Sequence, residues 1–341
     1  MIKTLKKSLP IILAVLGLTL FTFIAAKAGI HPVGNALKKV GFSGFLLLII
    51  IQLILDLGLG LAWKAAVPQL SFFRLTSARI VRDAATACLP FSQLGGMLIG
   101  VRATISGQSP HDIYGKPITW PEAIAANLVD ITTEVLGQIA FIGLALICLI
   151  GYRGSSAFII PLILGMLFLI VGSVGFIWTQ KNGGSLLRKT SSFLGHHIAA
   201  DWQKIMTNNS ELFQERLENL WDRPDRIALG ALTHLFCWIG SAFVTWVSFL
   251  LLGAHISFLA ALAIEGVVCG IMSAGFLVPG ALGVQEIGYV TLGMVFGIDA
   301  QVSLSISLLR RGRDIFIGIP VLLIWQFVEI TCLKHKKSLN S

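Results

Sequence analysis

The sequence predicts an all-α, polytopic integral membrane protein, and three observations support this prediction. Hydrophobic residues make up 55% of the 341 positions, and charged residues make up only 13%. The mean hydropathy is +0.83, far above the range of ordinary soluble domains. Long runs without a charged residue recur along the chain, and roughly 20 apolar residues are enough for a helix to cross a bilayer.

These runs predict about six membrane-spanning helices. Their approximate ranges are 9–27, 41–63, 122–150, 156–179, 227–252 and 301–332. Two further apolar stretches, near 72–106 and 257–298, are broken by proline and glycine, so we expect each to form a re-entrant helical hairpin. The first run could instead be a secretory signal, because lysines precede it, but its length favours an uncleaved helix.

The distribution of positive charge predicts the orientation in the membrane. With this threading, 19 of the 26 lysines and arginines fall on the cytoplasmic side, as the positive-inside rule requires. We therefore expect both termini in the cytoplasm.

The chain is expected to form a single membrane domain, 1–341. Its first half is 1–179 and its second half is 227–332, and each half contains one hairpin. Between them, 180–226 is expected to be cytoplasmic, and apolar and charged residues alternate at helical spacing over 196–222. That pattern fits an amphipathic helix on the inner leaflet or, equally well, a solvated loop helix.

The two halves are expected to be related as an inverted repeat. The helices at 41–63 and 227–252 run in opposite directions, and each is followed by a hairpin. LPFSQLGGMLIG at 89–100 and VPGALGVQEIG at 278–288 share a proline followed by glycine four or five residues later. Inverted repeats with broken helices form transport sites near the middle of the bilayer.

The hairpin tips must be buried in protein or line a wet cavity, because broken helices leave unpaired backbone groups that are costly in hydrocarbon. A new helix beginning near Val284 favours an anion at its first turn, which could be a lipid phosphate or Glu286 itself. The residues assigned to the two tips are Pro90, Gly95, Gly96, Pro279, Gly280 and Gly283.

Charged residues inside the predicted spans are expected to line a substrate groove. Each such charge costs roughly 2.5–3.5 kcal/mol at the bilayer centre, so it needs a partner or water. Asp130 and Glu134 share one helix face, and the arginines of 310–313 interrupt an apolar span. The groove residues are Asp130, Glu134, Gln285, Glu286, Arg310 and Arg313. An internal ion-pair network is the alternative, and 310–313 could also be an interfacial cluster.

Other polar residues allow simpler interpretations. Asp56 could join the groove or bond to a neighbouring helix, and His234 is expected to be a hydrogen-bonded packing residue. The arginines at 74, 79 and 82 predict a cytoplasmic interfacial helix rather than a substrate contact.

Several classes of function lack support in the sequence. There is no Walker A, HExxH or GxSxG motif, and the five cysteines form no CxxC pair or zinc-ligand pattern. We therefore expect no metal, no cofactor and no catalytic residue. The net charge of +9 follows membrane topology, so no nucleic-acid partner is expected.

Two long segments resemble a known family. FLVPGALGVQEIGYVTLGMVFGI at 276–298 and LSISLLRRGRDIFIGIPVLLIWQ at 304–326 resemble the C-terminal signature of the lysylphosphatidylglycerol synthase transmembrane-domain family, in particular its hopanoid-biosynthesis-associated branch. LPFSQLGGMLIGVRAT at 89–104 and NLVDITTEVLGQIAF at 127–141 are similar to its N-terminal half.

This resemblance implies a flippase-like domain that moves lipid between leaflets of a bacterial inner membrane, with two re-entrant elements around a groove. The chain ends shortly after its last predicted span, so no aminoacyl-transferase activity is expected. The residues that match the family pattern are Pro90, Gly95, Gly96, Asp130, Glu134, Pro279, Gly283, Gln285, Glu286, Arg310 and Arg313.

The leading hypothesis is therefore a lipid translocase or lipid-transport protein whose substrate is a membrane lipid. On the resemblance alone, that lipid is a hopanoid or an aminoacylated or polyol lipid. An intramembrane lipid-modifying enzyme is the second hypothesis. A non-catalytic scaffold, with lipid-biosynthesis enzymes as its partners, is the third.

Overall fold

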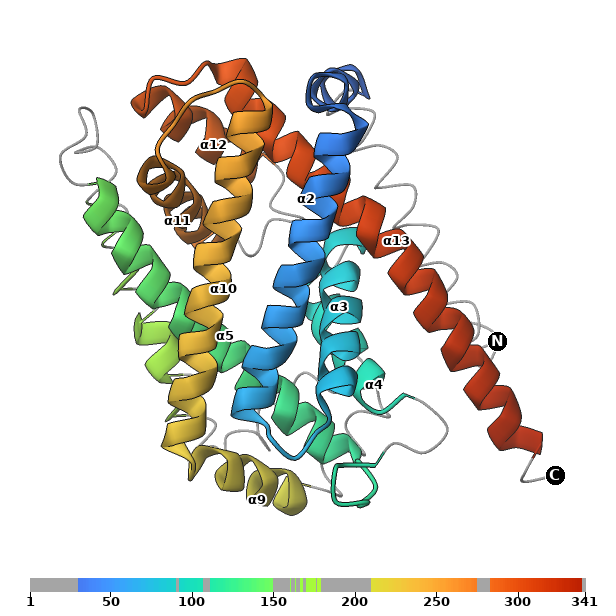
Figure 1. The fold of residues 1–341 in the computed structure, drawn as a ribbon. Coiled ribbons are helices and arrows are strands. Elements are labelled where there is room, and N and C mark those ends of the chain that lie inside the picture. The colour runs from blue at the N-terminus through green and yellow to red at the C-terminus, as the bar shows by residue number, and fades with distance from the viewer. Residues whose placement is uncertain are drawn as a thin grey trace, which may run out of the picture.

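The computed structural model (Figure 1) describes residues 30–89, 92–106, 111–149, 210–274 and 283–338, with isolated positions between 160 and 178. Within these ranges the chain is built from helices, so the predicted all-α class is confirmed. The helices are α2 (Ile30–Ala66), α3 (Phe72–Cys88), α4 (Ser92–Thr104), α5 (Trp120–Leu149), α9 (Ser210–Trp221), α10 (Pro224–Leu251), α11 (Phe258–Ala274), α12 (Val284–Val295) and α13 (Ala300–Ser338).

Four of the described helices are long and apolar enough to cross a membrane. They are Ala36–Ala66, Trp120–Leu149, Pro224–Leu251 and Ala300–Cys332, and they match four of the six predicted spans. The predicted span 9–27 lies outside the described residues, and 156–179 is described only at isolated positions. Helix α2 is kinked at Gly41, whose backbone angles of φ 73° and ψ 168° are not helical, so one helical segment ends there and a second begins at the start predicted for the span.

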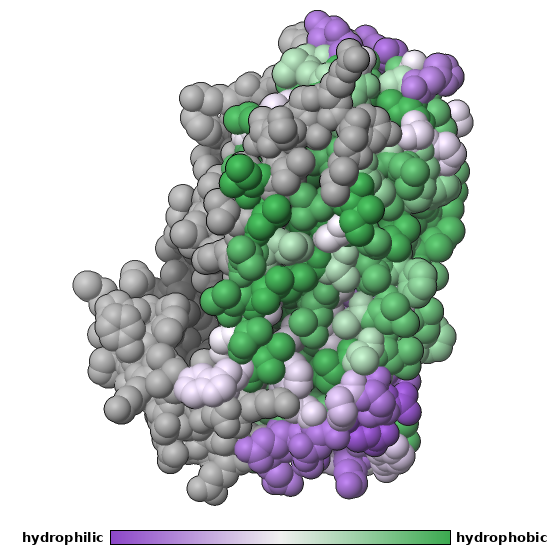
Figure 2. Space-filling model, turned by 90° about the vertical axis from the view of Figure 1, so that its left-hand side faces the viewer, coloured by the Kyte–Doolittle hydropathy of each residue, from purple (hydrophilic) through white to green (hydrophobic). Residues whose placement is uncertain are grey.

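The surface of the protein fits a lipid environment. Figure 2 shows a broad hydrophobic band on one face, between polar surfaces at the two ends. Large apolar side chains stand exposed on three spanning helices, among them Ile54, Phe236 and Phe327. Soluble proteins rarely expose contiguous apolar surfaces of this kind, so the chain is a multi-pass membrane protein.

Two pairs of neighbouring helices occupy the predicted hairpin segments. α3 packs along α4, and α11 packs against α12. The first pair is close because Gly96 and Gly100 of α4 lie against Thr86 and Arg82 of α3, where a side chain would collide. The tip residues Pro90, Pro279 and Gly280 lie outside the described residues. The re-entrant path and the inverted repeat stay predictions.

Helix α13 connects the two helix pairs. It runs obliquely past α2 and α3 (Figure 1) and also packs on α12. Gly318 of α13 approaches Cys88 and Ala84 at the end of α3. Phe316 meets Phe45 of α2 edge to face, with ring centroids 5.8 Å apart. The charged segment 310–314 is therefore held between the end of α3 and the start of α12.

Helix α9 lies across one end of the long helices (Figure 1). Its apolar side chains Phe213, Leu217, Leu220 and Trp221 are buried in one hydrophobic cluster with residues of α5. The amphipathic pattern is thus present over 210–221, but the apolar face contacts protein rather than lipid. Residues 196–209 of the predicted amphipathic helix lie outside the described residues.

Candidate functional site

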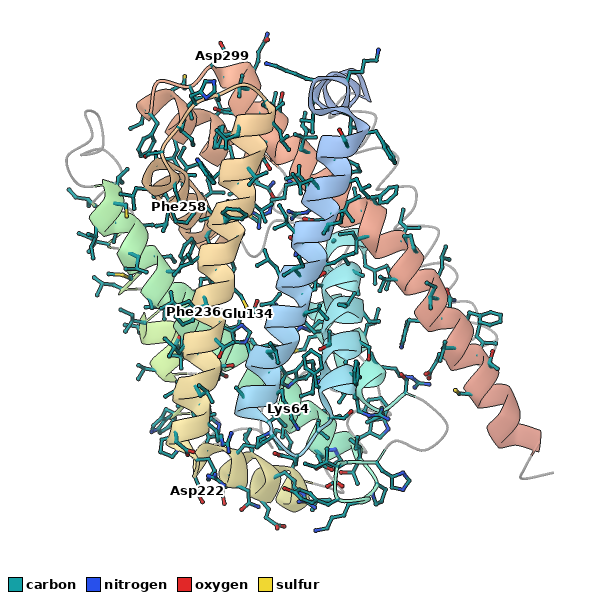
Figure 3. The ribbon with its side chains drawn as sticks, viewed as in Figure 1. Lys64, Glu134, Asp222, Phe236, Phe258 and Asp299 are labelled. Atoms are coloured by element: carbon teal, nitrogen blue, oxygen red, sulfur yellow. The ribbon has the colours of Figure 1, made fainter. Side chains whose placement is uncertain are left out.

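Two groups of charged side chains lie inside the helical bundle. The first, called here the lower cluster, consists of Arg79, Arg82, Asp83, Asp130, Glu134 and His234. Asp130 and His234 each follow the start of their spanning helix by ten residues, or about 15 Å at 1.5 Å per residue. In Figure 3, Glu134 accordingly lies well inside the protein, whereas Asp222 and Asp299 mark its two ends.

Arg79 is the centre of the lower cluster. Its Nε donates to Asp83 at 2.7 Å, its Nη1 to Asp130 at 3.1 Å and to Glu134 at 2.9 Å, and its Nη2 to Glu134 at 2.6 Å. The side chain is only 4% exposed. Its guanidinium thereby ties α3 to α5 through charge-assisted hydrogen bonds, which are stronger than neutral ones.

Arg82 provides a second bridge between the same helices. Its Nη2 donates to Asp130 at 2.7 Å and to Glu134 at 3.3 Å. The guanidinium carbon lies 5.4 Å from the ring centroid of Trp63, a cation–π contact. Because Nη1 of Arg82 is buried without a hydrogen-bond partner, this guanidinium keeps donor capacity that the protein does not use.

His234 brings α10 into the lower cluster. Its Nε2 lies 3.2 Å from Asp130 Oδ1, and both side chains are fully buried. The close approach depends on Gly137 of α5, whose missing side chain leaves room for the backbone of α10 and for the Cβ of His234. His234 is therefore the hydrogen-bonded residue that the sequence predicted, and its partner is a groove acid.

The interpretation of Arg79 and Arg82 as interfacial residues is wrong. Both are buried, and they pair with the two acids that the sequence placed in the groove. The guanidinium groups that pair with Asp130 and Glu134 therefore come from α3, whereas Arg310 of α13 pairs with Glu265. Arg74 is only partly buried. Its side chain donates to the carbonyls of Thr104 in α4 and Ser106 just after it.

The second group, called here the upper cluster, is built on the charged segment of α13. Its members are Glu265, Glu286, Tyr289, Arg310, Arg311, Arg313 and Asp314. Arg310 follows the start of its span by ten residues, again about 15 Å. In Figure 1, α12, which carries Glu286 and Tyr289, lies near the end of the bundle opposite α9.

Glu265 of α11 anchors the upper cluster. It is 1% exposed and accepts hydrogen bonds from Ser241 and Thr245, each at 2.7 Å, and from the hydroxyl of Tyr289. Nη1 of Arg310 pairs with Glu265 and also donates to the Tyr289 hydroxyl at 2.9 Å. Four donors on one carboxylate fix the position of Arg310, as a buried ion pair requires.

The start of α12 is held by α13. Glu286 pairs with Arg311, with Nε 2.7 Å from Oε1, and its Oε2 accepts the backbone N–H of Gly283 at 2.8 Å. Gln285 donates to the Ser307 hydroxyl at 2.9 Å. Glu286, one of the two anions that the sequence allowed at this helix start, thus caps α12. Gly283 itself has φ 79, which only glycine adopts freely.

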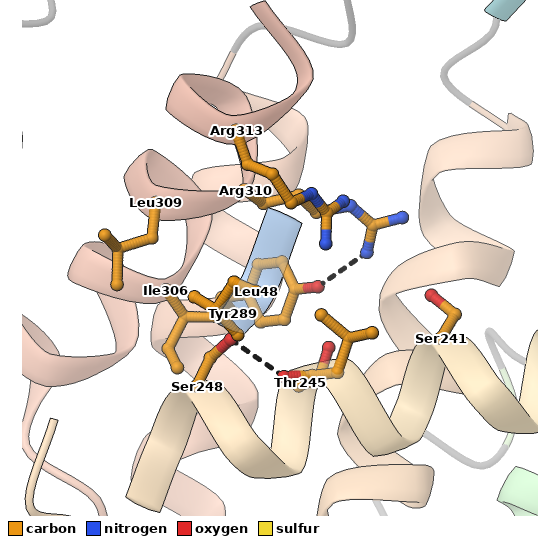
Figure 4. Close-up of a pocket in the computed structure, with 10 residues that line it drawn as sticks. Leu48, Ser241, Thr245, Ser248, Tyr289, Ile306, Leu309, Arg310 and Arg313 are labelled. Carbon is orange, nitrogen blue, oxygen red and sulfur yellow. Dashed lines mark hydrogen bonds between the residues drawn. The ribbon is translucent and has the colours of Figure 1, made fainter. Parts of the chain in front are cut away.

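A small pocket opens beside Arg310 (Figure 4). Arg310 and Arg313 point into the same space, next to the Tyr289 hydroxyl and above Ser241 and Thr245 of α10. Its remaining lining residues are Leu48, Val244, Ser248, Ile306 and Leu309. The pocket has room for about one water molecule, and two guanidinium groups line it.

The structure thus divides the predicted groove residues between the clusters. Asp130 and Glu134 belong to the lower cluster, and Glu286, Arg310 and Arg313 belong to the upper one. Gln285 lies beside the upper cluster, where it binds Ser307. Gly95 and Gly96 lie on α4, beside the end of α3. The sequence did not predict that Glu265 contacts Tyr289, nor that hydroxyl groups of α10 bind Glu265. Their spacing was a usable signal, because Ser241, Thr245 and Ser248 share one helix face.

The described residues contain no group of histidine, cysteine, aspartate or glutamate side chains that could hold a metal ion. The acids of the lower cluster, Asp83, Asp130 and Glu134, are paired with arginine.

The chain is similar to known membrane proteins. A UPF0104 membrane protein of Pyrococcus horikoshii is 22% identical to this chain, over 97% of the chain and 98% of that protein. No solved structure matches. The model of the family described as the lysylphosphatidylglycerol synthase TM region matches residues 10–321, which is nearly the whole chain. The chain therefore belongs to the lysylphosphatidylglycerol synthase transmembrane-region family.

Proposed function

We propose that this protein moves a lipid between the two leaflets of a membrane and binds the lipid headgroup in the pocket beside Arg310. The observation that carries the proposal is that Arg310, which is paired with Glu265, lines a polar pocket between membrane-spanning helices. An arginine at this depth is costly. Arg310 is held in place by Glu265, which also accepts hydrogen bonds from Ser241, Thr245 and Tyr289. Such an arrangement suits the recognition of a phosphate or another anionic headgroup.

The predicted groove residues take different roles in this proposal. Arg310 and Arg313 bind the headgroup, because both line the pocket. Gln285 and Glu286 hold the start of α12 next to it. Asp130 and Glu134 hold α3 against α5, and so keep the first helix pair in place. The acyl chains of the lipid stay outside, along the exposed apolar faces of α2 and α13.

Transport requires the pocket to change size. In its present form it has room for about one water molecule, whereas a lipid headgroup is several times larger. The headgroup therefore enters only when helices around the pocket separate. The ion pair between Arg311 and Glu286 joins α13 to α12, so these helices are the proposed moving parts, in the manner of domain and helix gating.

The proposed location is a bacterial inner membrane, with both termini in the cytoplasm. Its support is the distribution of lysine and arginine along the sequence and the family match. Phosphatidylglycerol and a polyol-bearing hopanoid are the lipids to test first, the former because the family name includes a phosphatidylglycerol lipid.

The test is a leaflet-exchange assay with purified protein in liposomes that contain fluorescent phosphatidylglycerol. Arg310→Gln is expected to slow exchange about tenfold or more, because it removes charge-assisted hydrogen bonds of about 1.5–3 kcal/mol. Arg102→Gln is the matched control, since Arg102 pairs with Glu329 outside the pocket. Exchange by Arg310→Gln at the wild-type rate would contradict the proposal.

A second variant guards against misfolding of Arg310→Gln, which leaves Glu265 without its cation. Arg310→Lys keeps the charge but loses the flat, forked geometry of guanidinium. We expect Arg310→Lys to fold and still to exchange lipid more slowly than wild type. Mass spectrometry of the exchanged lipid should show no change of mass, whereas a new product mass would favour a lipid-modifying enzyme.

A further inference from the structure

The hydroxyl group of Tyr289 joins the acid and the cation of the upper cluster that lie nearest the pocket. Tyr289 belongs to α12 and is fully buried. Its hydroxyl group donates to Oε2 of Glu265 and accepts a hydrogen bond from Nη1 of Arg310 at 2.9 Å. A phenol has one proton to donate, and here Glu265 receives it. Tyr289 therefore determines how Glu265 and Arg310 meet, a role that the sequence did not indicate.

Arg310 holds Glu265 by one nitrogen only. Arginine frequently binds a carboxylate with two nitrogens on two oxygens. Here Nη1 of Arg310 pairs with Oε1 of Glu265, which also accepts from Ser241. Oε2 accepts from two hydroxyl groups, those of Tyr289 and Thr245. Because a carboxylate oxygen accepts about two hydrogen bonds, both oxygens are saturated, and a second nitrogen of Arg310 has no place on Glu265.

This one-nitrogen contact leaves donors of both pocket arginines unused. Arg313 uses Nε and Nη2 on Asp314. Among the described residues, no hydrogen-bond partner is present for Nη1 of Arg313, or for Nε and Nη2 of Arg310. All three nitrogens remain accessible, and Figure 4 shows both guanidinium groups pointing into the same space. The pocket is thus supplied with free N–H donors that belong to two positive charges.

The described residues that line the pocket include two arginines and no acid. Glu265 is 1% exposed and already accepts from four donors. The hydroxyl groups of Ser241 and Thr245 donate to Glu265, and that of Ser248 donates to the carbonyl of Val244. Each has used its one proton, so each can only accept a further hydrogen bond. A glycerol hydroxyl group can donate to them without adding charge, whereas an ammonium group would meet two like charges and no free carboxylate.

We propose that the pocket selects lipids whose headgroup carries a phosphate and hydroxyl groups but no ammonium group, and that Tyr289 positions Arg310 to bind that phosphate. Phosphatidylglycerol is a lipid of this class, whereas phosphatidylethanolamine and aminoacylated phosphatidylglycerol are not. The Tyr289 hydroxyl group keeps Arg310 on one oxygen of Glu265, so the other nitrogens of Arg310 are left for the phosphate. This inference rests on the proposed function and names the substrate class of the same pocket.

A competition between two lipids tests the selection. Native mass spectrometry of the full chain in detergent, with equal amounts of phosphatidylglycerol and phosphatidylethanolamine, gives the occupancy of each. The wild type should carry phosphatidylglycerol about tenfold more often, because like charges placed together disfavour the wrong partner. Aminoacylated phosphatidylglycerol should compete no better than phosphatidylethanolamine.

Two arginine variants show whether the preference arises in the pocket. Arg313→Gln removes one of its two positive charges and should reduce the preference. Arg102→Gln removes a charge outside the pocket and should keep it. Equal occupancy by the two lipids in the wild type, or a full preference in Arg313→Gln, would overturn the selection.

The role of Tyr289 is tested by Tyr289→Phe, which removes the hydroxyl group and keeps the ring. Oε2 of Glu265 then loses one donor, and a second nitrogen of Arg310 can replace it, so we expect the variant to fold. That nitrogen is withdrawn from the pocket. The affinity for phosphatidylglycerol should therefore fall about tenfold, the effect of one charge-assisted hydrogen bond. Tyr114→Phe is the matched control, since Tyr114 is 74% exposed, and it should bind like the wild type.

Two hydroxyl variants separate positioning by Tyr289 from a general loss of structure. Thr245→Val frees the same oxygen, Oε2, and should weaken binding in the same way as Tyr289→Phe, which keeps the test valid if Tyr289→Phe does not fold. Ser241→Ala frees Oε1, the oxygen that Arg310 already contacts, and should weaken binding less. The unfolding temperature without lipid checks that each variant is folded. Equal binding by Tyr289→Phe and Tyr114→Phe, or equal losses in Thr245→Val and Ser241→Ala, would overturn the role of Tyr289.

None of these binding measurements requires transport. A protein that binds phosphatidylglycerol selectively but does not exchange it between leaflets would contradict only the proposed function. A protein that exchanges lipid but binds phosphatidylglycerol and phosphatidylethanolamine equally would contradict only the selection.

Discussion

Replacing Asp130 by alanine is expected to destabilise the folded protein by about 3–5 kcal/mol, because it removes one partner from a buried ion-pair network. Asp130 is fully buried and accepts hydrogen bonds from Arg79 and Arg82, and it also contacts His234. Without it, Glu134 remains as the one α5 acid for two buried guanidinium groups. The free energy of unfolding, measured in detergent micelles with denaturant, provides the number.

Asp225→Ala is the matched control for Asp130→Ala. Asp225 also lies near two arginines, Arg223 and Arg226, but its side chain is 63% exposed. Exposed ion pairs contribute about 0–1 kcal/mol, so Asp225→Ala should be close to wild type. Equal effects of the two substitutions would mean that Asp130 is hydrated rather than buried among its partners. Asp130→Asn should fall between them, because it keeps the shape of the side chain.

Spanning helices could be predicted from the sequence because their main determinant is local. The helix expected at 122–150 is α5, Trp120–Leu149, and the helix expected at 227–252 is α10, Pro224–Leu251. Transfer from water to lipid depends on the composition of each segment, whatever its neighbours. The end of α3 at Cys88, after which Leu89 is extended, and the start of α12 after Gly283 were also indicated, since proline and glycine act on their own part of the backbone.

The partners of the buried charges could not be predicted in the same way. Asp130 and Glu134 were recognised as acids in need of cations, but several arginines could have met that need. The pairing with Arg79 and Arg82 depends on how α3 packs against α5, which is a tertiary property. One signal pointed to it. Arg79 and Arg82 are three residues apart and so share a helix face, as Asp130 and Glu134 do.

The pocket was missed for a related reason. Ser241 and Thr245 lie within a charge-free run that predicts only a membrane span, because small hydroxyl groups hardly change the mean hydropathy. Their role depends on a tertiary contact, because Glu265 of α11 accepts a hydrogen bond from each. Glu265 lies in a segment that the sequence assigned to a hairpin, so its distance to α10 was not fixed by any local rule.

The contact between α5 and α10 provides the second large expected effect. Gly137→Leu should destabilise the protein by about 3 kcal/mol or more, at or above the upper end of the usual cost of overpacking. A Cβ at this position would lie 2.8 Å from the Ala231 carbonyl oxygen and 2.9 Å from the Leu235 nitrogen. Both are backbone atoms, so a rotamer change cannot relieve the collision and α10 itself must move.

That movement would also separate His234 from Asp130, since the Cβ of His234 lies 2.9 Å from the same point. Gly143→Leu on the same helix is the matched control. No atom lies within 4 Å of a Cβ at Gly143, and leucine favours a helix over glycine by roughly 1 kcal/mol. We therefore expect Gly143→Leu to be neutral or slightly stabilising in the same unfolding measurement. If Gly137→Leu unfolds like Gly143→Leu, the two helices do not pack as closely as the structure shows, and the lower cluster loses its contribution from α10.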